Sequence, residues 1–273
     1  MTHKSRNIRR ISVLITGIGC AVFLLLLLGK DCLNKQHSRH IASASWSYSD
    51  LNNALWQAAA GGDNVRLGFL LGQGADCNAT DHGGQSALMA AVNNNKLISA
   101  ELLLKAGADC EYADPLGRRV LAQAAAAGNL PALDLLLRCK ARINSGAMEG
   151  KTALLAACRN GQTATVVYLL KKRCDLWPGQ TDFRGPVVTA LRNNHPAIAR
   201  ILLDNGGNIN ELDENLDSVL ILSVRCADIE LVQYILKNHH PDLLHTNKQG
   251  ENALDVARKI GNRQLVALLE KVQ

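Results

Sequence analysis

Residue types that could perform chemistry are present in this 273-residue chain, but their spacing matches no catalytic or metal motif. The stretch Asp213-x-Asn215-x-Asp217 opens like a calcium-binding loop. It then departs from one, because Ser218 stands where the loop needs Gly and Val224 where it needs a bidentate Glu. No H-E-x-x-H, G-x-S-x-G, P-loop or dinucleotide-binding fingerprint occurs in the sequence. The sequence therefore predicts neither an enzyme nor a cofactor.

Cysteines and histidines are also poorly placed for a metal. No two cysteines form a C-x-x-C pair, and none lies at zinc-ligand spacing from a histidine. His239, His240 and His245 cluster, but Asp242 is the nearest carboxylate, which favours a solvated loop. We expect most cysteines to be buried as small hydrophobic side chains. The eight are Cys20, Cys32, Cys77, Cys110, Cys139, Cys158, Cys174 and Cys226.

Basic side chains recur at a fixed spacing of 33 residues and indicate binding rather than catalysis. The first set, called here the inner basic row, is Arg159, Arg192, Arg225 and, one residue late, Lys259. The second set, the hairpin basic row, is Arg118, Lys151 and Arg184. Regular lines of positive charge would raise the on-rate and specificity for an acidic partner. The alternative is that both rows only keep the protein soluble.

Apolar residues lie beside the hairpin basic row, in segments rich in turn residues. They are Leu116, Met148, Phe183 and Leu216. Phe183 and Leu216 stand where Gly84 and Gly117 stand in equivalent segments, so they give up a residue suited to a tight turn. Apolar side chains on exposed loops usually mark a surface that a partner covers.

The same 33-residue period runs through the elements that must position these residues. Apolar anchors recur in step, and so do the points where a second helix should end. The anchors are Leu88, Leu121, Leu154, Val187 and Leu220, and the helix exits are Gly74, Gly107, Lys140, Arg173 and Gly206. Glycine supplies the positive φ that ends a helix, so the exits at Lys140 and Arg173 should be slightly strained.

These residues resemble the ankyrin repeat, whose consensus contains G-x-T-P-L-H-x-A-A and LLL-x-x-GAD-x-N. The resemblance covers about Tyr48 to Gln273 and is strong at the leucines, alanines and exits. The consensus His is replaced by Met89, Leu155 or Val188, for example, so apolar packing must substitute for its hydrogen bonds. The resemblance implies an all-α solenoid of about seven helix-turn-helix repeats, at 48–80, 81–113, 114–146, 147–179, 180–212, 213–246 and 247–273.

That architecture implies where the two basic rows and the apolar residues lie. The inner basic row should end the inner helices and face the concave groove, while the hairpin basic row and the apolar residues should sit at the hairpin tips. Like charges at this spacing repel weakly through salt water, so the fold should tolerate reversal of Arg159, Arg192 and Arg225 to Glu.

Charge is concentrated at the amino terminus. The first 40 residues hold seven Lys or Arg and one acid, which accounts for the whole net charge of +6. The repeats are therefore neutral overall, and nucleic acid is not a predicted partner.

A membrane anchor is predicted before the repeats. Residues 1–10 form a basic tail, residues 11–29 a transmembrane signal-anchor helix, and residues 30–47 a polar spacer. Ile11–Leu28 carries no charge and would span about 27 Å as a helix, close to the roughly 30 Å hydrocarbon core. A cleaved signal peptide is the alternative, with Ala42-Ser43-Ala44 as a distant cleavage sequence. The positive-inside rule favours repeats outside the cytoplasm, in the periplasm if the source is bacterial, and the reverse orientation stays open.

The expected function is binding of another protein with an acidic face. Bacterial chains that combine an anchor or export signal with ankyrin repeats suggest accessory proteins that protect, sequester or neutralise a partner. Two alternatives remain open: electrostatic docking to anionic lipid or a polyanion, and a missed enzymatic or metal site scaffolded by the repeats. Salt should abolish docking to a polyanion but only weaken an interface that includes Phe183 and Met148.

Overall fold

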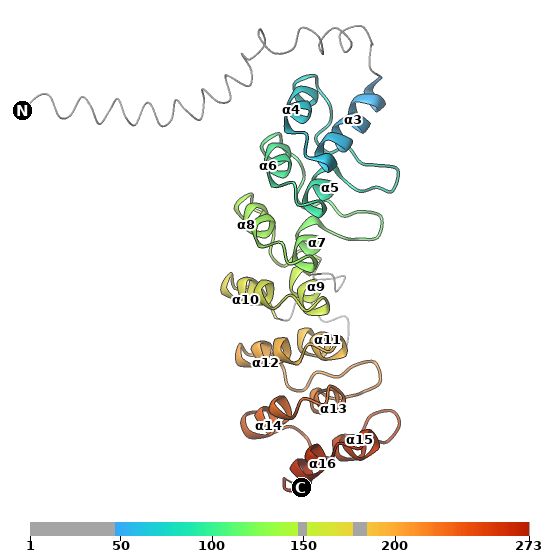
Figure 1. Ribbon diagram of the computed structural model, residues 1–273, viewed down its shortest axis with the longest axis vertical. Coiled ribbons are helices and arrows are strands. Elements are labelled where there is room, and N and C mark those ends of the chain that lie inside the picture. Colours follow the sequence, from blue (N-terminus) through green and yellow to red (C-terminus); the bar gives the residue numbers. More distant parts are fainter. Residues whose placement is uncertain (1–46, 147–151, 177–184, 273) are drawn as a thin grey trace, which may run out of the picture. The chain divides into compact units, whose positions relative to one another are not determined.

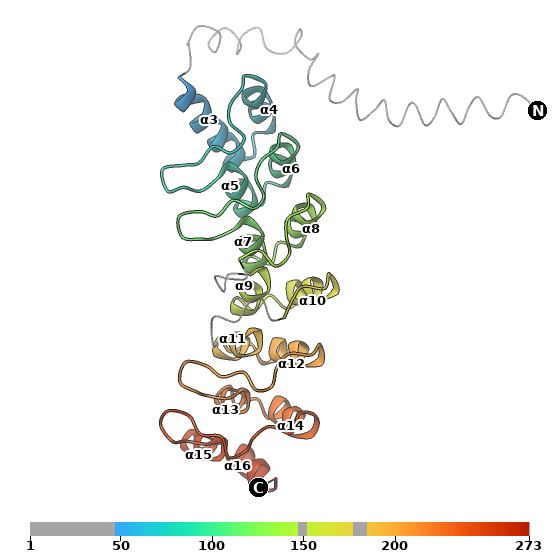
Figure 2. The same cartoon turned by 180° about the vertical axis from the view of Figure 1, so that it is seen from behind.

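The computed structural model describes residues 47–146, 152–176 and 185–272, and these ranges contain fourteen α-helices. Residues 48–273 form one compact unit. Two parallel columns of helices make up this unit, with hairpin loops projecting from the inner column (Figures 1 and 2). Each inner helix contacts the next inner helix and its own outer partner. Seven antiparallel pairs thus follow one another, as the sequence period predicts.

The inner helices are α3 (Tyr48–Gly61), α5 (Ala87–Asn93), α7 (Val120–Ala126), α9 (Ala153–Arg159), α11 (Pro186–Arg192), α13 (Val219–Arg225) and α15 (Ala253–Ile260). The outer helices are α4 (Asn64–Gly72), α6 (Leu97–Lys105), α8 (Leu130–Arg138), α10 (Thr163–Lys171), α12 (Pro196–Asp204), α14 (Ile229–Asn238) and α16 (Arg263–Glu270). No helix in the described ranges is both long enough and apolar enough to span a membrane. The predicted anchor, Ile11–Leu28, lies outside those ranges.

The periodic anchors form the core between the two columns. All five anchors predicted on the inner helices, from Leu88 to Leu220, are at most 3% exposed. The outer helices contribute a matching buried row: Leu70, Leu103, Leu136, Leu169, Leu202 and Ile235. Met89, Leu155 and Val188, at the place of the family His, are buried too. Apolar packing has replaced that polar residue, as predicted.

Outer helices end in the left-handed conformation that the sequence predicts. Gly74, Gly107 and Gly206 have positive φ, and so do the non-glycine exits Lys140 (φ 68°) and Arg173 (φ 59°). The amide of the following residue closes each exit by donating to a carbonyl five residues earlier, as Ala141 does to Leu136. The ends of the outer helices thus share one geometry, even where Lys or Arg must adopt the left-handed backbone conformation that residues with a side chain disfavour.

Helix α11 begins differently from its neighbours. Ser86, Thr152 and Ser218 cap α5, α9 and α13 with their own side chains, but Gly185 precedes α11 and has none. The carboxylate of Glu211 takes this role instead, accepting a hydrogen bond from the Val188 amide at 2.8 Å. A Cβ atom on residue 185 would collide with that carboxyl group. Gly185 and Glu211 therefore form one matched unit, and α11 carries Arg192 at its other end.

Candidate partner-binding face

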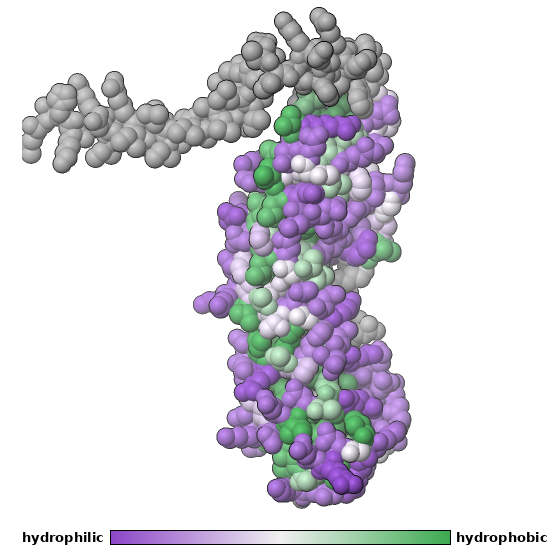
Figure 3. Space-filling model, in the orientation of Figure 1, coloured by the Kyte–Doolittle hydropathy of each residue, from purple (hydrophilic) through white to green (hydrophobic). Residues whose placement is uncertain are grey.

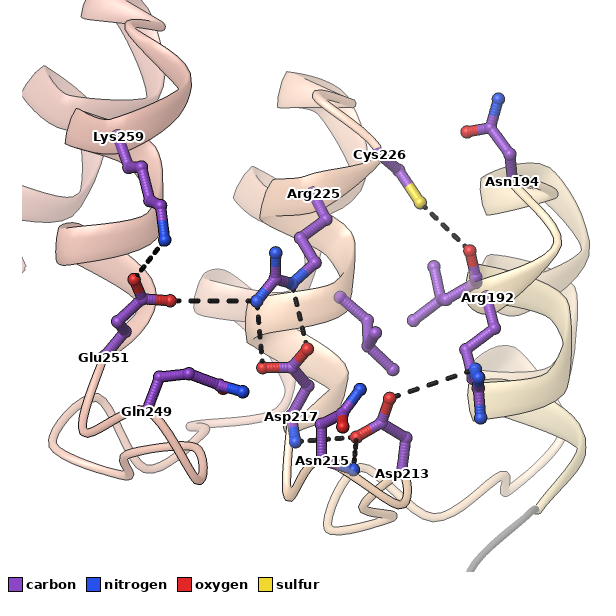
Figure 4. A pocket seen from close by; sticks show the side chains of 12 residues that line it. Arg192, Asn194, Asp213, Asn215, Asp217, Arg225, Cys226, Gln249, Glu251 and Lys259 are labelled. Atoms are coloured by element: carbon purple, nitrogen blue, oxygen red, sulfur yellow. Dashed lines mark hydrogen bonds and ion pairs between the residues drawn. The ribbon is translucent and has the colours of Figure 1, made fainter.

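A cleft of about 760 Å³ opens between the hairpins and the ends of α11, α13 and α15 (Figure 4). Side chains from three consecutive repeats line it, including Arg192, Arg225 and Lys259 of the inner basic row. Asn194, Asn215 and Gln249 add uncharged polar groups to the lining. The structure thus brings three of the four members of that row into a single concavity.

Two buried carboxylates organise the floor of this cleft. Asp213 and Asp217 are 2% and 3% exposed. One oxygen of Asp213 accepts hydrogen bonds from the amides of Asn215 and Asp217, at 2.8 and 2.9 Å, and so closes the hairpin turn. Asp217 in turn accepts from the Asn247 side chain of the next repeat at 2.8 Å. These contacts give the Asp-x-Asn-x-Asp spacing a structural role in the hairpin.

Carboxylates pair with the basic side chains of the cleft. Arg225 donates to Asp217 at 2.9 Å and lies 3.9 Å from Glu251. Lys259 contacts Glu251 at 2.6 Å, which lowers the pKa of that carboxyl. Three cations and three carboxylates line the cleft, so it is neutral overall rather than basic. Figure 4 shows these cations of the inner basic row and the carboxylates beside them.

Arg192 has an outward-facing partner as well. Its guanidinium contacts Glu214 at 2.7 Å and lies 3.9 Å from buried Asp213. Glu214 is about half exposed, so this pair sits at the rim of the cleft. The Arg225 side chain is slightly more exposed than that of Arg192, 42% against 34%, but its main contact is with a buried carboxylate, whereas that of Arg192 is with Glu214 near solvent.

The contact between Arg225 and buried Asp217 changes what is expected when all three arginines are reversed. Glutamate at this position would place a second negative charge beside buried Asp217 and remove the cation that contacts it. Arg159 differs, because it is exposed at the end of α9 and forms no ion pair within the described ranges. Arg159 is the member of the row best placed to meet a partner's charge.

The hairpin basic row is only partly described. Arg118 donates to Asp114 at 2.6 Å, within its own hairpin. Burial disfavours ionisation of Asp114, but the hydrogen bonds from the Arg118 backbone and side chain outweigh it and lower the pKa of this carboxyl. Lys151 and Arg184 lie outside the described residues.

Apolar tip residues are exposed where the structure describes them. Leu116 is 65% exposed and Leu216 is 37% exposed. Leu216 adopts φ 59°, the same left-handed region as Gly84 and Gly117, which confirms that it occupies a glycine position. A ring nitrogen of His245 lies 2.7 Å from the Leu216 carbonyl and helps to hold this tip. Met148 and Phe183 lie outside the described residues.

Sequence reasoning missed the carboxylates that serve the inner basic row. Asp213, Asp217 and Glu251 stand at hairpin positions that recur with the repeat period. The period that revealed the arginines could therefore also have placed these carboxylates close to them. The expectation for cysteines was also wrong: of the six described, only Cys158 is buried, and Cys139 is exposed. Within the described ranges, no group of three or more His, Cys, Asp or Glu side chains could hold a metal ion.

Comparisons with known proteins agree with this geometry. A family profile described as ankyrin repeats (3 copies) matches residues 55–147, 100–182 and 121–213. The ankyrin repeat domain of Bcl-3, a member of the IkappaB protein family, superposes with a TM-score of 0.67 at 22% identity. The human ASB11 ankyrin repeat domain gives the same two values. Each alignment covers 80% of this chain and 97% of the other.

No curated protein sequence matches this chain. The fold places it among repeat proteins whose extended surfaces serve as interaction sites for other proteins. The profile matches cover more than half of the chain, and the paired helices, exits and hairpins agree with them. The chain therefore belongs to the ankyrin-repeat family.

Proposed function

We propose that this protein is a membrane-tethered interaction module that holds a partner protein against the inner face of its later repeats and the adjacent hairpin tips. The observation that carries the proposal is the cleft of about 760 Å³, to which three consecutive repeats contribute polar and charged side chains. A concavity built from several repeats can contact an extended segment of a partner along its length. Exposed Leu116 and Leu216 add apolar contact area at the tips.

An acidic segment is the partner chemistry that this face favours. Exposed Arg159 can pair directly with a carboxylate of the partner. Arg192 can do the same if its contact with Glu214 is replaced by one with the partner's carboxylate. Lys259 is 70% exposed at its side chain and can likewise leave Glu251. Buried Asp213 and Asp217 stay in place and keep the arginines oriented. The balanced charge of the cleft favours such specific exchange over docking to a polyanion, which needs excess positive charge.

The tether in this proposal is the apolar stretch Ile11–Leu28, in a non-cleaved form. Four basic residues precede it and three follow, which supports repeats that face away from the cytoplasm. In a bacterium this compartment is the periplasm. A protein fixed there could protect, sequester or neutralise a partner at the membrane surface without performing any reaction on it.

Site-specific photo-crosslinking in the full chain tests the cleft. A photoreactive amino acid replaces Asn194, which lines the cleft, or Lys237, which is exposed on outer helix α14. Irradiation of native membranes should give a discrete adduct from position 194 and none from position 237. The Arg159→Glu/Lys259→Glu variant should lose the adduct, whereas Lys35→Gln/Arg39→Gln, in the predicted spacer, should keep it. Equal adducts from positions 194 and 237, or full retention in the first variant, would refute the proposed face.

A further inference from the structure

The outer surface of the first two repeats is unusually apolar. Val65 and Phe69 on α4 are 73% and 50% exposed, and Ile98 on α6 is 62% exposed. Val65 and Phe69 are four residues apart and share a helix face, and Ile98 occupies the place of Val65 one repeat later. Hydrophobic surface is visible over α4 and α6 in Figure 3 and continues in smaller areas along the outer column. We call these three residues the outer apolar patch.

Later repeats carry proline, alanine or glutamate at the place of Val65. Pro131 stands there on α8, Ala164 on α10, Ala197 on α12 and Glu230 on α14. An alanine offers only one methyl group to solvent, and a glutamate offers a charge. The large exposed aliphatic side chain at this place is therefore confined to the first two of these repeats.

The place of Phe69 also changes along the array, because tyrosine occupies it on α10 and α14. The Tyr168 hydroxyl donates to Asp134 at 2.9 Å, and the Tyr234 hydroxyl donates to Asp204. Each of these aromatic rings thus carries a polar group with a partner, whereas the Phe69 ring has none. Leu135 and Ile201 stand at this place on α8 and α12, so the outer face is better adapted to water on α10 and α14 than on α4.

The position of the patch in the chain identifies what could cover it. Residues 29–47, nineteen in all, separate the apolar stretch Ile11–Leu28 from the first helix. Nineteen residues span at most about 65 Å even when fully extended. The first two repeats follow the proposed tether most closely in the sequence, so the length of the chain limits their distance from the lipid. Arg66, exposed beside Val65, adds a positive charge suited to anionic headgroups.

We propose that the outer apolar patch rests in the interfacial region of the membrane that tethers the chain, an inference that depends on the tether in the proposed function. Three side chains would bind a lipid surface weakly by themselves. The tether supplies a high effective concentration, so a weak contact suffices. Aromatic and branched aliphatic side chains flanked by a cation are the residues that settle at this depth. Because the patch is on the outer column, the contact leaves the inner cleft open to a partner.

Fluorescence quenching in vesicles tests this contact. The full chain is reconstituted into phosphatidylcholine vesicles whose acyl chains carry bromine, a short-range quencher. An environment-sensitive fluorescent amino acid replaces Phe69 or, as the control, Leu244, which is 77% exposed in the sixth repeat. We expect quenching at position 69 to exceed that at position 244 about twofold or more, because only the former would reach the interface. Val65→Ser/Ile98→Ser should bring quenching at position 69 down to the control level.

Flotation of the same vesicles separates the two proposals. Chain that floats with the vesicles but shows equal quenching at both positions overturns the patch contact and leaves the tether intact. Chain that fails to float overturns the tether and the contact together. Energy transfer between labelled copies that rises with protein density and is lost in Val65→Ser/Ile98→Ser would assign the patch to a second copy, which also overturns the lipid contact.

Discussion

The early and the late repeats share one core but differ in where they place polarity. At the end of the inner helix, the early repeats carry Asn93 and Ala126, whereas the late ones carry arginine or lysine, which pairs with carboxylates in the fifth, sixth and seventh repeats. On the outer face, the first two repeats expose Val65, Phe69 and Ile98, whereas the fourth and sixth place a hydrogen-bonded tyrosine there. The buried apolar row packs the core in the same way in every repeat. The residues at the ends of the inner helices and on the outer face are not needed for this packing, so they can differ from repeat to repeat.

The largest effect is expected at the end of the stack. Deletion of Gly261–Gln273 removes α16, including Leu265 and Leu269, which are 0% and 1% exposed. Loss of two such side chains should cost roughly 3–6 kcal/mol and uncover the apolar flank of the sixth repeat. The truncated chain should melt early or aggregate, as measured by thermal unfolding and light scattering. Unchanged melting would show that α16 does not pack on its neighbours.

Glu211 should make the stability depend on pH in a direction unusual for a carboxyl group. Burial raises the pKa of Glu211 from 4.5 to about 7, although its hydrogen bonds from the Val188 and Val187 amides oppose the shift. The folded state then holds the proton more tightly than the unfolded state. The stability that protonated Glu211 contributes is fully present below about pH 4.5 and is lost as the pH rises through 7, by about 3 kcal/mol in total.

Urea unfolding between pH 5 and 8 measures this slope, because carboxyls with lowered pKa values, such as Asp114, are already ionised throughout that range. Glu211→Gln should flatten the slope. The first repeat has Ala79 at the equivalent place, so the effect is specific to the later half. A wild-type curve without a decline toward pH 7 would contradict the burial of an ionisable Glu211.

Arg225 and Arg159 should respond very differently to the same substitution. Arg225→Glu leaves buried Asp217 without its cation and should lower the free energy of unfolding by about 2 kcal/mol or more. Arg159→Glu changes an exposed residue and should stay within about 0.5 kcal/mol of the wild type. Chemical denaturation of the two variants measures the difference. Equal values would mean that the two members of the inner basic row are in equivalent surroundings.

The smallest effect concerns helix α4 in the first repeat. A Cβ atom added at Gly68, inside this helix, meets no atom within 4 Å. Gly68→Ala should therefore stabilise the protein by about 0.5–1 kcal/mol, because it restricts the unfolded chain. Gly185→Ala, in the later half, should destabilise it, because the new methyl group displaces the Glu211 carboxyl. Opposite signs in thermal unfolding would sharpen the contrast between the two regions.

The period of 33 residues was sufficient to predict the buried leucines, the helix pairs and the left-handed exits at Lys140 and Arg173. These features repeat locally, so one repeat predicts the next. The period could also have placed Asp217 near Arg225, eight residues later in the same repeat. The contacts of Arg192 with Asp213 and Glu214 could not be read in this way, since they depend on how the following hairpin lies against the end of α11. Cysteines such as Cys139 were misjudged because the helix exits lie near solvent. Four predicted site residues, Lys151, Arg184, Met148 and Phe183, lie outside the described ranges and stay predictions.

The bonds that join successive repeats also determine how the array should come apart. The first two repeats are linked by neutral bonds, such as Trp56 to the Gln85 carbonyl and the Ser99 hydroxyl to Asn64. Charged contacts add to the linkage of later repeats, as Arg142–Glu111 between the second and third and as Arg192–Glu214 and Arg225–Glu251 between the fifth, sixth and seventh. Dissolved ions screen charged contacts much more than neutral ones. Because an array of repeats unfolds unit by unit from its weakest junction, rising ionic strength should shift fraying toward the carboxyl-terminal end.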